Sequence, residues 1–133
     1  MAVKYPHMKQ FEGELWERFL KRIPWKASAI SYDVHLGEGA TLPLETPDWV
    51  KRMALALSAK RVDVVVETAN ETIIVEIKER ASLSAVGQLL GYLALYVKQF
   101  RPRKRMRLVC VCRTVAPDMD VIFAEYGIEV YIV

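Results

Sequence analysis

Residues 61–67, RVDVVVE, and residues 72–79, TIIVEIKE, decide the fold of this chain. Each is a run of mostly β-branched residues about as long as a strand, and the short polar segment between them predicts a hairpin. Nearly continuous apolar strands of this kind are typical of sheets covered by helices on both faces. Three charged residues interrupt the two runs: Asp63, Glu76 and Lys78.

Helices and strands alternate on either side of this hairpin. Apolar residues recur at helical spacing in some segments and run together in others, and Gly and Pro mark the breaks. This order of elements predicts an α/β domain in which a central mixed β-sheet is flanked by helices. We expect helices over 9–23, 46–57, 82–100 and 118–126, the last ended by Gly127, and further strands over 29–36, 108–112 and 128–133.

The length and composition fit a single domain covering residues 1–133. With 53% hydrophobic residues the chain can build one core, but a large second domain does not fit. We find no signal-peptide pattern and no run of the roughly 20 apolar residues that cross a bilayer, so we expect a cytoplasmic protein without a membrane partner. Cys110 and Cys112, two residues apart in an apolar strand, are expected to be buried thiols rather than zinc ligands.

The charged residues in the hairpin predict a small acidic cluster. Glu76 and Lys78 share one face of their strand because side chains alternate, and the hairpin brings Asp63 beside Glu76. Two carboxylates this close repel each other, and a divalent cation between them removes the repulsion. The alternative is purely structural, with Asp63 and Glu76 in ion pairs with Lys78 and Arg61.

This pattern resembles the core motif of the PD-(D/E)XK nuclease superfamily. In RVDVVV and IIVEIK, Asp63 matches the first acid, Glu76 the second and Lys78 the lysine. Val62 stands where the family name has proline. The resemblance covers most of the chain and implies a restriction-endonuclease-like core, similar to that of Holliday-junction resolvases.

The family commonly carries a Gln–x–x–x–Tyr-like pair on the helix after the lysine strand. Gln88 and Tyr92, one helical turn apart, match this pair. Gly87 and Gly91 lead us to expect that one face of this helix lies very close to the sheet. Gln88 would then reach the acidic cluster, where its amide could bind phosphate or a metal-bound water.

A glutamate on the first helix is the family's other common site residue, and three candidates compete here. Helical phase puts Glu12 in the middle of the inward apolar stripe, whereas Glu14 and Glu17 fall on the solvent side. We therefore expect Glu12 to join the site, with Glu14 as the fallback. Asp33 and His35 are left out of the predicted site, because lone histidines of this kind are more often structural.

The resemblance implies metal-assisted hydrolysis of a phosphodiester, most readily in DNA. One or two Mg²⁺ (or Mn²⁺) ions would be held by Glu12, Asp63, Glu76 and the Ile77 carbonyl, with Lys78 orienting the attacking water. We expect structure-dependent or weakly sequence-dependent cleavage, and a homodimer, because cutting both strands of a duplex needs two active sites. The alternative is a catalytically silent nucleic-acid-binding or scaffold protein on the same fold.

A run of cations is the second feature that points to nucleic acid. Five of the seven residues from 101 to 107 are basic, in a chain with a net charge of +3. We expect this run, together with the loop 37–46, to contact the phosphate backbone. The predicted nucleic-acid-binding residues are Arg101, Arg103, Lys104, Arg105 and Arg107.

Overall fold

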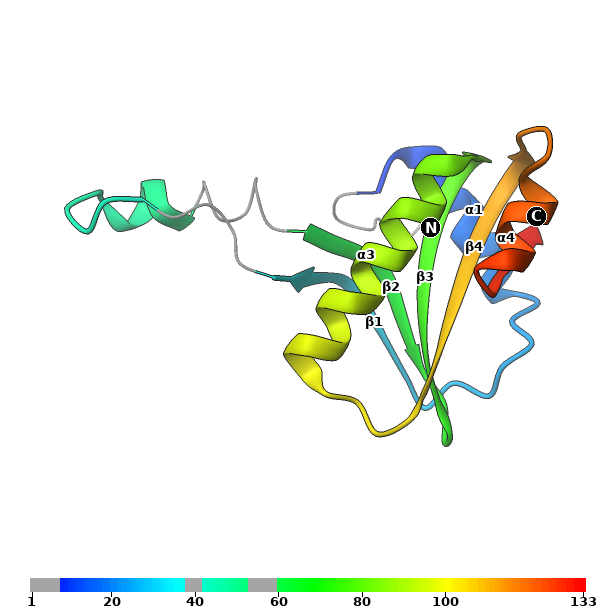
Figure 1. Ribbon diagram of the computed structural model, residues 1–133, viewed down its shortest axis with the longest axis horizontal. Helices are drawn as coiled ribbons and strands as arrows, with labels where there is room; N and C mark the ends of the chain where they lie inside the picture. The colour runs from blue at the N-terminus through cyan, green and yellow to red at the C-terminus, as the bar shows by residue number, and fades with distance from the viewer. Residues whose placement is uncertain (1–7, 38–41, 53–59) are drawn as a thin grey trace.

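The computed structural model describes residues 8–37, 42–52 and 60–133. Within these ranges the chain forms a five-stranded sheet with helices on both faces, as Figure 1 shows. The helices are α1 (Gln10–Leu20), α3 (Leu83–Phe100) and α4 (Met119–Glu125), and the strands are β1 (Ala29–Leu36), β2 (Lys60–Glu67), β3 (Glu71–Ala81), β4 (Arg105–Val115) and β5 (Ile128–Ile132).

The sheet is mixed, and its strands lie in chain order, β1-β2-β3-β4-β5. β1, β2 and β3 pair antiparallel, whereas β3, β4 and β5 pair parallel. The change of direction at β3 follows from the connections, because β2 and β3 form a hairpin while α3 carries the chain back between β3 and β4. The mixed α/β fold predicted from the sequence is therefore the one observed.

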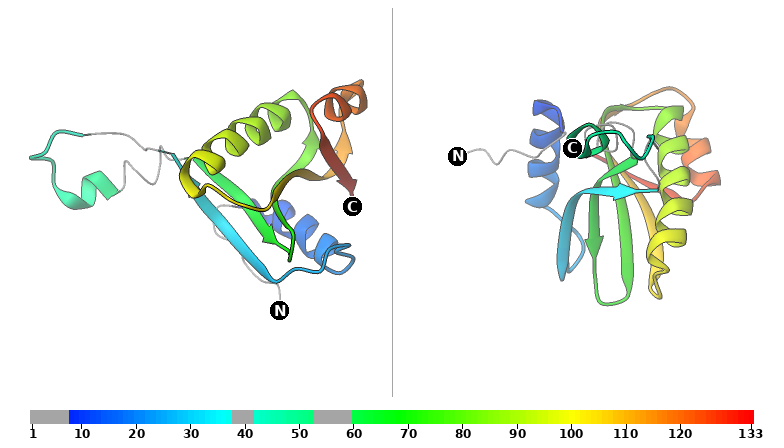
Figure 2. Two further views of the ribbon diagram at one scale, coloured as in Figure 1. Left: turned by 60° about the horizontal axis from the view of Figure 1, so that its bottom comes forward. Right: turned by 90° about the vertical axis from the view of Figure 1, so that its left-hand side faces the viewer.

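Two apolar layers hold the helices on the sheet (Figure 2). On one face α1 contributes Leu15, Trp16 and Phe19, all buried against the valines and isoleucines of the central strands. On the other face α3 and α4 pack through residues such as Leu89 and Phe123. This double cover explains the continuous apolar runs of β2 and β3, which have no solvent-facing side.

The feature of the fold that matters most for function is a fork between β2 and β3. The two strands pair only from Val64↔Val75 to Glu67↔Thr72, next to the hairpin turn. Beyond Val64, β2 stays with β1 as far as Lys60, whereas β3 stays with β4 as far as Ala81. Figure 1 shows the two strands meeting at the hairpin and separating towards the other end.

Several of the observed element boundaries differ from the expected ones. α1 ends at Leu20, earlier than expected, and β4 begins at Arg105, so part of the basic run belongs to a strand. Gly127, with φ of 65°, takes the left-handed conformation expected after a helix. The helix expected over 46–57 is seen over 48–52, and its remainder lies outside the described residues.

The expectation for Gly87 and Gly91 was wrong. Both glycines are exposed, and a Cβ built on either would meet nothing within 4 Å. They therefore lie on the outer side of α3, while residues such as Val86 and Leu89 face the sheet. Spacing four residues apart places two glycines on one helix face, but it does not say which face packs.

Candidate active site

The acidic residues meet where β2 and β3 separate. Continued into the fork, the hairpin register would pair Ile77 with Val62, but backbone pairing stops at Val64↔Val75. The Ile77 N–H instead donates to Oδ2 of Asp63 at 2.9 Å. The Asp63 carboxylate thus takes the place of a strand carbonyl. The N–H and C=O of one strand residue point to the same side, so the Ile77 carbonyl also faces the fork.

Glu76 is the buried member of the cluster, with a relative exposure of 3%. Its Oε2 atom is buried without a hydrogen-bond partner. Burial, a hydrogen bond with Asp63 and the charge of Asp63 raise the pKa of Glu76 to about 10, against the opposing effect of Lys78. Without a cation at this position, the carboxyl pair therefore keeps a proton at neutral pH.

Glu12 approaches the same pair from the first turn of α1. Burial and the charge of Asp63 raise the pKa of Glu12, while the Lys9 N–H, which donates to Glu12 Oε2 at 3.4 Å, and Lys78 lower it. By contrast, Glu14 is exposed and accepts a hydrogen bond from Gln10. The structure therefore brings Glu12, rather than Glu14, to the acidic cluster.

Lys78 supplies the positive charge of the site. Its side chain is half-buried, and its charge lowers the pKa values of both Glu76 and Glu12. Arg61, the other cation of the structural alternative, lies 3.8 Å from Asp33. Lys78 is thus the cation whose charge acts on both Glu76 and Glu12.

α3 covers the carboxyl pair with Tyr92. Burial and the charges of Glu76 and Asp63 raise the pKa of the Tyr92 hydroxyl, which places it close to both carboxyls. Gln88 lies one turn earlier on the same helix, and its Oε1 is buried without a hydrogen-bond partner. A buried amide oxygen without a partner is costly, so this position favours a ligand that donates a hydrogen bond.

Two buried thiols form the wall of the site towards β4. Glu76 is in register with Cys110, and Lys78 with Cys112. Both thiols are free and buried, as expected from the sequence. Hydrogen bonding to Cys112 and burial raise the pKa of Cys110, so it stays a neutral thiol beside Glu76.

The residues of the fork fit a hard divalent cation. Among the described residues, no three His, Cys, Asp or Glu side chains form a ready-made metal cluster. Asp63 and Glu76 form a pair, and Glu12 interacts with it only through its charge. Mg²⁺ usually takes one or two carboxylates and fills its other positions with water or phosphate oxygens, so an acidic pair suffices. The unpartnered Glu76 Oε2 is the atom that most needs a cation or a proton.

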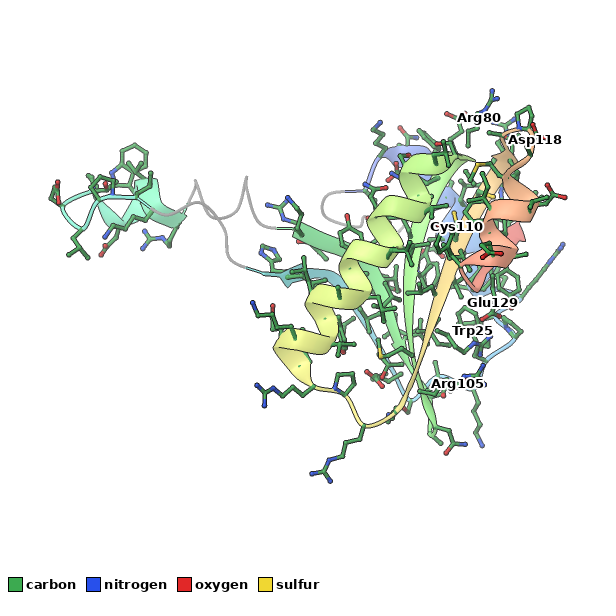
Figure 3. All side chains as sticks on the ribbon, viewed as in Figure 1. Trp25, Arg80, Arg105, Cys110, Asp118 and Glu129 are labelled. Carbon is green, nitrogen blue, oxygen red and sulfur yellow. The ribbon has the colours of Figure 1, made fainter. Side chains whose placement is uncertain are left out.

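The predicted basic run is not brought to this cluster. Arg105 is in register with Glu71 at the start of β3, whereas Glu76 lies five residues further along. At the rise of a strand, that separation is roughly 17 Å. Figure 3 shows Arg105 and Arg80 at opposite ends of the sheet, with Arg80 at the end where β3 leaves the site.

Two members of the run are engaged within the chain. Arg107 bonds Glu129 at 2.8 Å and Glu71 at 3.0 Å, and it stacks on Trp25. Lys104 lies 3.1 Å from Glu67 and also donates to the Thr68 carbonyl. Both cations are therefore paired with carboxylates of other strands.

A different group of cations was not singled out from the sequence. Arg18, Lys21 and Arg22 line a hollow of about 180 Å³ together with Val133. Their spacing of three and four residues would have placed them on one outer face of the first helix. We call these three residues the α1 basic face.

The comparisons with known proteins agree with the fold. An EndoMS-dsDNA2 complex has a TM-score of 0.53 and 15% identity, covering 99% of this chain and 48% of that one. A repair endonuclease from Pyrococcus abyssi has a TM-score of 0.53 and 16% identity, covering 99% of this chain and 49% of that one. This chain therefore spans about half the length of either structure. No curated protein matches its sequence.

The mixed sheet with flanking helices is a restriction-endonuclease-like α/β core, as in these solved structures. A family model described as "Endonuclease NucS C-terminal domain" matches residues 50–133. The chain belongs to this family. Within the part of the chain that the structure describes, no helix is long and apolar enough to cross a membrane.

Proposed function

We propose that this chain is a metal-dependent nuclease that hydrolyses phosphodiester bonds in DNA. The observation that carries the proposal is the buried Glu76 carboxyl, held against Asp63 in the fork with one oxygen unpartnered. Such a pair is costly for the fold unless it binds a proton or a cation. Membership of the NucS C-terminal domain family supports phosphodiester hydrolysis as the chemistry.

The metal ligands would be Asp63, Glu76 and the Ile77 carbonyl, with Glu12 completing the negative field. A bound Mg²⁺ or Mn²⁺ would polarise the scissile phosphate and lower the pKa of a bound water. Lys78 would orient the attacking water and offset the charge that develops on the phosphate. Gln88 would donate its amide N–H to a phosphate oxygen and accept from water through Oε1.

DNA is the substrate that the comparisons favour, because one of the similar solved structures is an EndoMS-dsDNA2 complex. Three exposed arginines of the run at 101–107, Arg101, Arg103 and Arg105, would contact phosphates at the far end of the sheet. Such contacts grip the backbone without reading bases, so we propose structure-dependent or weakly sequence-dependent cleavage. Cutting both strands of a duplex would use two copies of the chain.

The test is incubation with plasmid, single-stranded and branched DNA, and RNA, in Mg²⁺, Mn²⁺ and EDTA. We expect cleavage of DNA that requires metal and is lost in Glu76→Ala. Glu79→Ala, three residues along the same strand and exposed, is the matched control and should cleave normally. Metal-dependent cleavage by the Glu76→Ala variant would overturn the site assignment. DNA binding without cleavage of any substrate would favour a catalytically silent binding protein on this fold.

A further inference from the structure

The α1 basic face lies at the same end of the sheet as the acidic cluster. Lys78 is in register with Cys112, and Cys112 with Ile132, the neighbour of Val133. Two strand spacings separate Lys78 from Ile132, which is about 10 Å. The backbone of Val133, at the edge of the hollow, is therefore nearer to Lys78 than the start of β4 at Arg105 is.

α1 connects the two places directly. Its first turn carries Glu12, which interacts with Asp63, and its second half carries Arg18. Arg18 lies six residues beyond Glu12 on the same helix, about 9 Å along its axis. Double-stranded DNA presents one phosphate charge per roughly 1.7 Å of its axis, so one duplex at the fork covers this distance with several phosphates.

The charges of the α1 basic face are also exposed. Arg18, Lys21 and Arg22 are solvent-exposed, whereas the relative exposure of the Arg107 side chain is only 18%. Of the carboxylates on the outer side of the same helix, Glu14 lies one turn before Arg18 and is hydrogen-bonded to Gln10, and the partly exposed Glu17 lies one turn before Lys21. Three cations around one hollow repel each other, and a polyanion bound there removes that repulsion.

We infer that the α1 basic face binds the phosphate backbone of double-stranded DNA leaving the active site. This inference rests on the proposed function and adds the surface that positions the duplex over Asp63 and Glu76. Cations in the last turn of a helix also interact favourably with its dipole. That role would affect only the stability of the fold, so DNA binding and unfolding must be measured on the same variants.

The experiment measures binding of a fluorescent 30-base-pair duplex in EDTA, between 50 and 300 mM KCl. For Arg18→Gln/Arg22→Gln we expect Kd to rise about tenfold near 100 mM salt, and the slope of log Kd against log salt to fall by about 2. Lys26→Gln/Lys98→Gln is the control, because it removes the same charge from exposed lysines towards the hairpin end of the sheet. The control should keep the wild-type slope, and urea midpoints should agree for all three proteins.

Each outcome separates this inference from the proposed function. Wild-type cleavage of DNA, together with unchanged Kd and slope in Arg18→Gln/Arg22→Gln, would overturn the α1 basic face and leave the nuclease standing. If the wild type cuts no DNA but Arg18→Gln/Arg22→Gln binds DNA more weakly than the wild type does, the α1 basic face is supported and the nuclease is refuted. Equal losses in the control variant would show that only net charge matters, which also overturns the inference.

Discussion

The sharpest consequence of the fork is that Glu76→Gln should stabilise the metal-free protein. The pKa of Glu76 is raised to about 10 in the fold, against 4.5 for a free glutamate. The folded state therefore holds a proton that the unfolded chain releases above about pH 4.5. Because the folded pKa is the higher one, the stability from this group is complete below pH 4.5 and is lost as pH rises towards 10.

The size of the effect follows from that difference. One pKa unit corresponds to about 1.4 kcal/mol, so stability falls by up to that amount per pH unit inside this window. Glutamine has the shape of a protonated glutamate, and its amide can donate to Asp63 without any titration. Wild type and Glu76→Gln should be similar at pH 5, and by pH 9 the variant should be about 5 kcal/mol more stable.

The assay is urea unfolding at pH 5, 7 and 9, in EDTA and in 10 mM MgCl₂. Glu14→Gln, on the exposed side of α1, is the matched control and should follow wild type at every pH. Magnesium should stabilise wild type, most strongly at high pH where the proton is easiest to displace, and should leave Glu76→Gln unchanged. A difference between wild type and Glu76→Gln that stays constant from pH 5 to pH 9 would refute the shared proton.

Three further predictions concern single side chains. Lys78→Met should lower kcat by 10²-fold or more; magnesium titration should show unchanged metal affinity, and a loss of affinity would make Lys78 structural. Arg107→Met breaks the links to Glu71 and Glu129, so urea unfolding should show a loss of about 2 kcal/mol with an unchanged salt dependence of DNA binding; a changed slope would contradict this. Gly91→Ala, with open space for its Cβ, should raise stability by about 0.5–1 kcal/mol, and a destabilised variant would mean that this face is packed.

The sequence predicts most of the fold because its signals are local. β-Branched runs, helical periodicity and the glycine at 127 each act over a few residues, and each appears where expected. The fork is not local. The proximity of Asp63 and Glu76 follows from the hairpin register. The pairing of β2 with β3 nevertheless stops at Val64, beyond which β2 pairs only with β1 and β3 only with β4. No feature of the hairpin alone indicates that Asp63 will bond the Ile77 N–H.

The glycines of α3 also show that a local pattern does not indicate how an element packs. Gly87 and Gly91 share a face with each other, but their spacing fits a packed face and an open one equally well. Which of these holds depends on the bulk of Val86 and Leu89, which bury themselves against β3 and turn the glycines outward. Tyr92 nevertheless lies close to Glu76, and the Gln88 Oε1 atom, one turn earlier, is buried.

The surroundings of the basic side chains were the feature that the sequence indicated least well. Arg105 and Arg107 stand in one run, yet their surroundings are set by strands distant in the sequence, and Glu71 and Glu129 close around Arg107 from β3 and β5. Residues three and four apart on a helix share a face whatever the rest of the fold does. Arg18 lies in the last turn of α1, Lys21 is its C-cap and Arg22 follows directly, so short spacing along the chain keeps the three cations together around one hollow.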